Sequence, residues 1–287
     1  AITKNAEWLI DNHVILKPVF TKDFQLAPSV GFNSKTGVFY LTIDSERTVV
    51  LDAKELSTDT LVPKGGNLVT QSPNQLMFID EKNDLISYRI NQQVYSFYDF
   101  ETNTWSNNDT EFEYSYEHDY WNNSANFHQQ DSTILSFGGY GYYRFNNNLV
   151  TIHPYETDIE NTYTALNTIS PRCTSATVIV EDTLYIFGGH GSTSGHQELG
   201  PENYYDFYAV DLQTLQAKKL WNMNTLGGSN FLPSENMIYD NEQHCFYAFI
   251  TQNGGKIIKL LPYQNVKEDL SFPLDINFAS QYQYTNF

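Results

Sequence analysis

Hydrophobic residues along the chain fall into short runs separated by polar turns, and a helical period is almost absent. In each repeated segment, two apolar runs of strand length flank a turn of Asn, Asp, Glu, Gln, Lys, Ser or Gly, residues that accept tight-turn geometry. The segments span 26–43, 72–90, 123–141, 174–191, 233–250 and, in part, 277–287. Their starts lie about 44 to 59 residues apart, which is the length of one four-stranded unit. The pattern predicts an all-β chain of repeated strand pairs.

A second pair of strands is predicted after each first pair. The stretches "VYSFYDFETNTW" (94–105) and "DFYAVDLQTLQAKKLW" (206–221) place an aromatic strand before a polar turn and a tryptophan after it. Trp105 and Trp221 are therefore expected to hold the outer strands of a four-stranded sheet together.

A double glycine ends the second strand of two units, at Gly138–Gly139 and Gly188–Gly189, and Pro171-Arg172 precedes the fourth unit. This order of Pro-Arg, strand, Gly-Gly, variable loop, aromatic-Asp, turn and Trp resembles the Kelch repeat. The fourth unit matches well, and the third has the double glycine but lacks the tryptophan. The first, second and fifth units keep the strand pattern but lack the double glycine at that strand end. The resemblance implies a β-propeller of four-stranded antiparallel blades.

We expect a single propeller domain over 1–287 with six blades, the last of them composite. The five full blades are predicted at 26–63, 64–108, 120–167, 169–222 and 229–272. The strands of 1–22 and 273–287 would form the closing blade, which removes the exposed sheet edges but is one strand short. Because the chain starts at Ala1 and not at Met, we expect it to be part of a longer protein, whose other domains are possible partners.

The formal net charge of −18 disfavours nucleic acids and anionic membrane surfaces as partners. No apolar run reaches the roughly 18 residues of a membrane span, so direct membrane insertion is not expected. Cys173 and Cys245 are too few for a disulfide scaffold and are interpreted as separate buried thiols. Little in the sequence fixes the compartment; an extracytoplasmic location, periplasmic or secreted, is the expectation.

The loop 188–201 contains residues that chemistry uses, but it matches no catalytic motif. A P-loop requires a lysine after its last glycine, but Gly195 is followed by His196. A dinucleotide fingerprint requires a third glycine, and Ser194 stands at that position. Thr193 stands where a nucleophile elbow has serine. His190, His196 and Glu198 could bind a transition metal, but their spacing matches no compact zinc site. We predict no metal and no cofactor.

Two enzyme types carry similar propellers. Galactose oxidase links a cysteine before one inner strand to a tyrosine before the next; Cys173 suits the first role, but 230–236 has no tyrosine, so the copper site is not expected. A sialic acid mutarotase uses a polar funnel, for which Arg144, Arg172, His190 and Glu198 are candidates. This carbohydrate-active enzyme is the alternative function.

The leading hypothesis is a non-enzymatic scaffold that recognises a protein or glycan through one face. The loops 138–148 and 188–205 are rich in Tyr, Asn and Ser, which suit recognition surfaces, and in a propeller they converge on that face. The candidate ligand-binding residues are Tyr140, Tyr142, Arg144, Arg172, His190, His196 and Glu198.

Three structural questions remain open. An enzyme predicts a deep pocket where Arg172, His190 and a carboxylate converge, whereas a scaffold predicts a broad, aromatic-rimmed face. The tyrosines of the two loops (142, 143, 204 and 205) could instead only fill space between blades. The acidic segment 107–127 could hold a cation or be a solvated face over packed aromatics.

Overall fold

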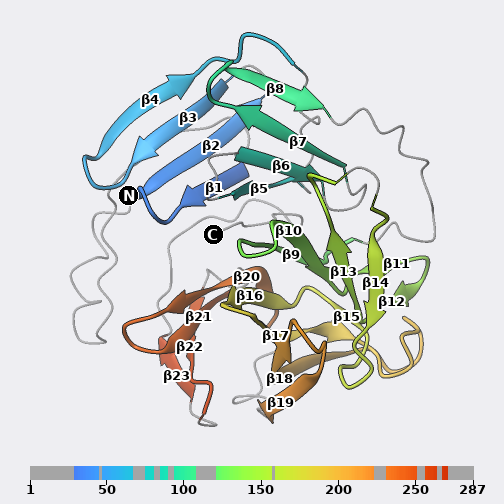
Figure 1. The fold of residues 1–287 in the computed structure, drawn as a ribbon. Helices are drawn as coiled ribbons and strands as arrows, with labels where there is room; N and C mark the ends of the chain where they lie inside the picture. The colour runs from blue at the N-terminus through green and yellow to red at the C-terminus, as the bar shows by residue number, and fades with distance from the viewer. Residues whose placement is uncertain are drawn as a thin grey trace.

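All regular structure in the part of the chain that the structure describes is β (Figure 1). The structure is a computed structural model, and the residues it describes are 29–44, 47–66, 75–80, 85–89, 94–107, 121–156, 159–222, 231–250, 256–263 and 267–270. The prediction of an all-β chain with four-stranded antiparallel sheets is confirmed. No helix that could cross a membrane occurs among these residues.

Each predicted blade range contains one four-stranded sheet. The first sheet is β1 (Ser29–Asn33), β2 (Val38–Asp44), β3 (Arg47–Asp52) and β4 (Ser57–Leu61). The second is β5 (Gln75–Ile79), β6 (Leu85–Arg89), β7 (Val94–Asp99) and β8 (Thr104–Asn107). The third is β9 (Ser124–His128), β10 (Thr133–Phe137), β13 (Asn148–Ile152) and β14 (Thr162–Ala165), with a small hairpin of β11 (Tyr140–Gly141) and β12 (Arg144–Phe145).

The fourth and fifth sheets are joined. The fourth is β16 (Ala176–Val180), β17 (Thr183–Gly191), β18 (Glu202–Asp211) and β19 (Ala217–Asn222), and β15 (Arg172–Cys173) pairs with the end of β17. The fifth is β20 (Pro233–Asp240), β21 (Cys245–Ile250), β22 (Lys256–Leu260) and β23 (Lys267–Leu270). One parallel bridge between Thr177 and Asn236 makes them a continuous nine-stranded sheet.

The five sheets follow one another around an arc, with their first strands toward the middle (Figure 1). Successive first strands pack against each other: β1 on β5, β5 on β9, β9 on β16, and β16 on β20. The described sheets do not by themselves form a closed ring, and the predicted closing strands in 1–22 and 273–287 lie outside the described residues.

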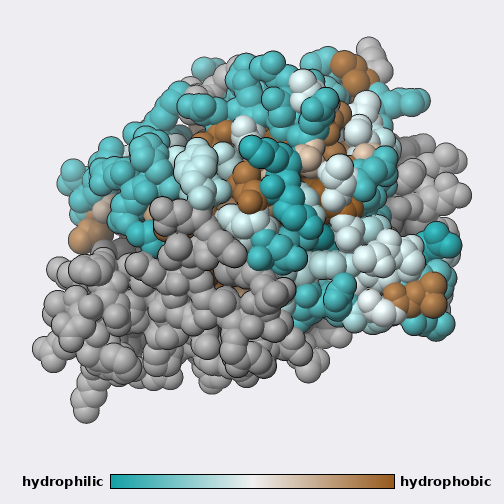
Figure 2. All heavy atoms as spheres, turned by 90° about the horizontal axis from the view of Figure 1, so that it is seen from below, coloured by the Kyte–Doolittle hydropathy of each residue, from teal (hydrophilic) through white to brown (hydrophobic). Residues whose placement is uncertain are grey.

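Apolar side chains fill the spaces between neighbouring sheets, since alternate residues of a strand face opposite sides. The largest cluster lies between the fourth and fifth sheets and includes Phe187, Phe207, Trp221 and Phe246. Trp105 and Trp221 are both buried, and Trp221 donates its indole N–H to the Leu261 carbonyl 2.8 Å away. The face seen in Figure 2 is largely hydrophilic over the described residues, with hydrophobic residues in small groups.

The turn between third and fourth strands has the same construction in three sheets. Asp52, Asp99 and Asp211 each accept hydrogen bonds from the backbone N–H groups two and three residues later. The residue four positions later has positive φ: Leu56 (53°), Asn103 (59°) and Leu215 (56°). The backbone N–H donors lower the pKa of all three aspartates. The aspartate that ends the third strand is thus a turn former.

Candidate binding face

The double glycines have the same backbone conformation in both sheets. Gly138 and Gly139 have φ of 71° and 114°, and Gly188 and Gly189 have 66° and 110°. Only glycine reaches these angles without strain. In the third sheet β10 ends just before its glycines, at Phe137. In the fourth sheet β17 does not end at the glycines, as the sequence had suggested: it continues through them to Gly191, with a register shift between Phe187 and Gly189.

Close approach of the segment that leads into the fourth sheet (residues 171–175, the lead-in segment) is a second reason for glycine. A Cβ on Gly138 would lie 2.5 Å from the Arg172 carbonyl oxygen, and one on Gly189 would lie 2.7 Å from the Cys173 carbonyl oxygen. The lead-in segment is tied to the third sheet at this point, because Gly139 donates its N–H to the Arg172 carbonyl at 2.8 Å. The double glycine of the third sheet thus packs against the start of the fourth sheet, and Gly189 packs against the lead-in segment within its own sheet.

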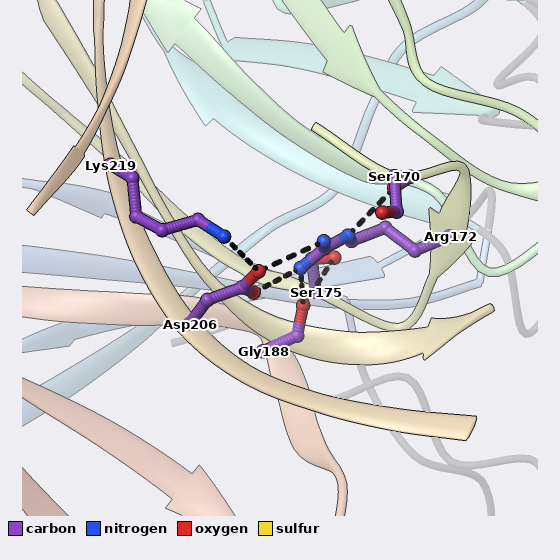
Figure 3. Close-up of polar contacts among 6 residues, drawn as sticks. All are labelled: Ser170, Arg172, Ser175, Gly188, Asp206 and Lys219. Atoms are coloured by element: carbon purple, nitrogen blue, oxygen red, sulfur yellow. Dashed lines mark hydrogen bonds and ion pairs between the residues drawn. The ribbon is translucent and has the colours of Figure 1, made fainter. Parts of the chain in front are cut away.

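Arg172 is a fully buried side chain that lies along the glycines (Figure 3). A Cβ added to Gly191 would lie only 2.9 Å from the Cβ of Arg172, and a Cβ added to Gly189 would lie 3.4 Å from its Cδ. The two glycines alternate along the strand and leave room for the aliphatic part of the arginine side chain. The guanidinium donates to the carbonyl oxygens of Ser170 and Gly188, at 2.9 and 3.0 Å.

The guanidinium also makes a bidentate ion pair with Asp206 of β18 (Figure 3). Nη1 lies 2.5 Å from Oδ1 and Nη2 lies 3.3 Å from Oδ2. Its Cζ lies 4.1 Å from the ring centroid of Tyr204, a cation–π contact. Hydrogen bonds and ion pairing thus satisfy the buried charge inside the fourth sheet.

Lys219 on β19 extends this network toward solvent. Its Nζ lies 3.7 Å from Asp206 Oδ2, and the side chain is about half exposed. A hydrogen bond with the Tyr208 hydroxyl is the main cause that raises the pKa of Lys219, and Asp206 adds to it.

His190 points to the other side of the strands from Arg172. In the antiparallel pairing, Arg172 lies opposite Gly191 and Cys173 lies opposite His190, so the side chains of Arg172 and His190 leave opposite faces. His190 Nδ1 lies 2.7 Å from Asn203 Oδ1, and the ring packs edge-on against Phe145 with centroids 5.5 Å apart. Arg172 and His190 therefore do not converge on one point.

A Cys-His-Asn row crosses three adjacent strands: Cys173 lies opposite His190, and His190 lies opposite Asn203. The same three residue types form the catalytic triad of papain-like thiol hydrolases. Burial raises the pKa of Cys173 to about 11, and the carboxylate of Glu235 contributes to the same rise. A thiol in this environment stays protonated, whereas a nucleophile needs the thiolate. The row therefore holds His190 in position without an activated cysteine.

The two glycine loops dock on each other and form one surface, which we call the loop face (Trp121, Tyr140–Phe145 and Gly195–Leu199). Phe145 donates its N–H to the Gly195 carbonyl at 2.8 Å, and Gln197 donates to the Tyr143 carbonyl at 3.2 Å. Arg144 and His196 form a β-bridge. The hydroxyl of Tyr140 donates to the side-chain oxygen of Gln197. Tyr140, Arg144 and His196 lie where the two loops dock, and Tyr142 and Glu198 belong to the same two loop segments. Five of the seven predicted residues are thus part of the loop face.

Several aromatic residues of the loop face are exposed. Trp121 is 45% exposed, Tyr142 65% and Tyr143 67%, and Leu199, Arg144 and Glu198 are also exposed. Tyr205 is buried and Tyr204 lies against Arg172, so these two do fill the interior as one hypothesis expected. Sequence reasoning did not select Trp121, which pairs with Tyr140 through backbone hydrogen bonds of 2.7 and 2.8 Å.

Tyr142 and Tyr143 adopt an unfavourable backbone conformation at the tip of the β11–β12 hairpin. Gly141 pairs with Arg144, which leaves a two-residue turn whose φ angles are 51° and 61°. Positive φ at both positions defines a type I′ turn, for which Asn-Gly is the preferred sequence. The left-handed region costs an L-residue about 1–2 kcal/mol. Two exposed tyrosines thus occupy the positions least suited to them.

The described residues contain no group of three or more His, Cys, Asp and Glu that could hold a metal ion. Most of the acidic segment, 108–120, lies outside the described residues. The chain matches no family model, and no curated protein is significantly similar to it.

Proposed function

We propose that the five sheets are blades of a single Kelch-like β-propeller of six blades, closed by strands from 1–22 and 273–287. The arc of sheets and the contacts between successive first strands support this arrangement. The lead-in arginine and the double glycines of the third and fourth sheets support the Kelch assignment, because the glycines of both sheets pack against the lead-in segment that carries the arginine.

We infer that the protein is a non-enzymatic binding module that recognises a protein or glycan through the loop face. The observation that carries this proposal is the Tyr142-Tyr143 turn. These side chains are exposed and their backbone is strained. Strain at an exposed turn is expected where the side chains serve a contact. Tyrosine and tryptophan provide large, rigid contact areas of the kind that anchor interfaces.

Two observations favour binding over the mutarotase alternative. Arg172 is engaged with Asp206 inside the sheet, and His190 leaves the opposite face of the strands. Arg172 and His190, two of the groups assigned to a proton-transfer site, are therefore held apart. His196, which forms a β-bridge with Arg144, and His190, whose ring packs against Phe145, serve as ligand contacts in this proposal.

The test is a glycan array and a peptide array probed with the wild-type protein and with the double variant Tyr142→Asn/Tyr143→Gly. The variant supplies the preferred sequence of a type I′ turn, so the hairpin keeps its shape while both aromatic rings are removed. Tyr263→Asn is the matched control, because Tyr263 follows β22 in the fifth sheet and is 88% exposed.

Signals that the double variant loses and the control keeps would support the loop face as the binding site. Ligands bound equally by all three proteins would overturn it. Turnover of an array sugar by the wild-type protein would favour the enzyme alternative.

A further inference from the structure

Glu235 is a buried carboxyl at the junction of the fourth and fifth sheets. It lies in β20 and is only 8% exposed. Pro233 pairs with Ile250 and Met237 with Ala248, so three residues of β20 lie opposite one residue of β21. This bulge turns the 234–236 segment away from the ladder. Glu235 therefore sits where regular pairing within the fifth sheet is interrupted.

The same bulge carries the contact between the two sheets. Asn236 forms the parallel bridge with Thr177 of β16. The Thr177 hydroxyl donates to the Glu235 carbonyl oxygen at 3.4 Å and accepts from the Asn126 amide of β9 at 2.6 Å. A change at Glu235 thus acts directly on the strand that links three neighbouring sheets.

No basic side chain among the described residues forms an ion pair with the Glu235 carboxyl. From β15, Cys173 is the titratable group that interacts with it, and it is a protonated thiol. β16 carries no titratable residue, and those of β21 are Cys245 and Tyr247. Those of β17 are Tyr185 and His190, and His190 Nδ1 lies 2.7 Å from Asn203 Oδ1. On β9 the one ionisable residue is His128, two positions beyond Asn126 and bound to Asp131 and Asp182. On β20 itself, Asp240 lies at the far end in a turn.

We propose that Glu235 is a pH-sensitive latch between the fourth and fifth sheets: the latch holds while the carboxyl is protonated and weakens when the carboxyl ionises. An ionised carboxylate in this position lacks a compensating charge, and a buried, unpaired charge is strongly unfavourable. Ionisation therefore drives the bulge of β20 toward water and away from β16. The proposal is independent of the function of the loop face.

The direction of the pH dependence follows from burial. Burial raises the pKa of Glu235 from 4.5 to about 7. A carboxyl whose pKa is higher in the folded chain stabilises the fold when protonated, and this stability is lost as pH rises from about 4.5 through 7. This rise in the pKa of Glu235 corresponds to roughly two orders of magnitude in the folding equilibrium constant when complete. Most of that change, roughly 50- to 100-fold, falls between pH 5 and 8.5.

The experiment compares the wild-type protein with Glu235→Gln by urea unfolding at pH 5 and 8.5. Glutamine keeps the shape and removes the ionisation, so the ratio of the folding constants of the variant and the wild type should rise roughly 50- to 100-fold between these pH values. Glu242→Gln, in the exposed turn after Asp240, is the matched control and should leave the ratio unchanged.

Hydrogen exchange of the β16 and β20 amides locates the effect. The measured quantity is the amide exchange rate of the wild type divided by that of the variant. This ratio should increase from pH 5 to 8.5 in β16 and β20, and it should stay constant in β2 and β3. A pH-independent ratio in both measurements would overturn the latch, and so would a ratio that rises equally in every sheet. A variant less stable than the wild type at pH 8.5 would also overturn it.

Discussion

Removing Asp206 while Arg172 remains is the substitution that the structure predicts to be most damaging. Asp206→Ala removes the carboxylate that pairs with the fully buried guanidinium of Arg172. The guanidinium then keeps its hydrogen bonds to the carbonyl oxygens of Ser170 and Gly188 but has no counter-charge from Asp206. Breaking a buried ion pair from one side costs about 3–5 kcal/mol. Because the whole stability of a domain is about 5–15 kcal/mol, this loss would leave the protein marginally folded.

Two comparisons separate the buried charge from general damage. Arg172→Met/Asp206→Leu replaces both charged groups with apolar ones, and it should recover most of the loss, since such replacements are often neutral or stabilising. Lys219→Met removes the exposed partner of Asp206 and should cost about 1 kcal/mol or less.

The assay is urea unfolding followed by the fluorescence of the buried tryptophans 105 and 221. The reasoning would be refuted if Asp206→Ala cost no more than Lys219→Met, or if the double variant were no more stable than the single one. Should Asp206→Ala be unfolded without urea, recovery of a cooperative transition in the double variant provides the same test.

Three further outcomes are expected. Gly191→Ala should lower the melting temperature strongly, because its Cβ would lie 2.0 Å from the Pro171 carbonyl oxygen; Gly65→Ala, with no heavy atom within 4 Å, is the control for the same assay. Leu56→Gly should stabilise the first sheet by about 1 kcal/mol or less in urea unfolding, because the relief of the left-handed conformation exceeds the added chain entropy. Asp211→Asn should make the protein lose less stability as the pH falls. Backbone donors lower the pKa of Asp211, so the ionised wild-type residue stabilises the fold above pH 3.8 and loses this effect in acid. Melting curves between pH 2.5 and 6 would show no difference in slope if this turn were irrelevant.

The strands were predictable because alternation and turn residues act locally. Each of the five predicted ranges contains one four-stranded sheet. Turn aspartates such as Asp99 likewise follow from short-range hydrogen bonding.

The positions of the site residues depended on partners far along the chain. Arg172 reads as an exposed ligand contact until Asp206, 34 residues away, is placed beside it. The alternate glycines 189 and 191 were the signal for a side chain lying across the strand. Burial of Glu235 arises from the packing of two sheets and has no local signature. The exposure of Trp121 depends on its pairing with Tyr140 across the loop.

The most direct test of the loop face is a joint measurement of stability and binding on Tyr142→Asn/Tyr143→Gly. We predict a higher melting temperature than that of the wild type, because both positive-φ positions receive their preferred residues, together with loss of binding to every array ligand that the wild type retains. A variant that melts lower and still binds would contradict the account, because the two tyrosines would then be supporting the fold and not the contact.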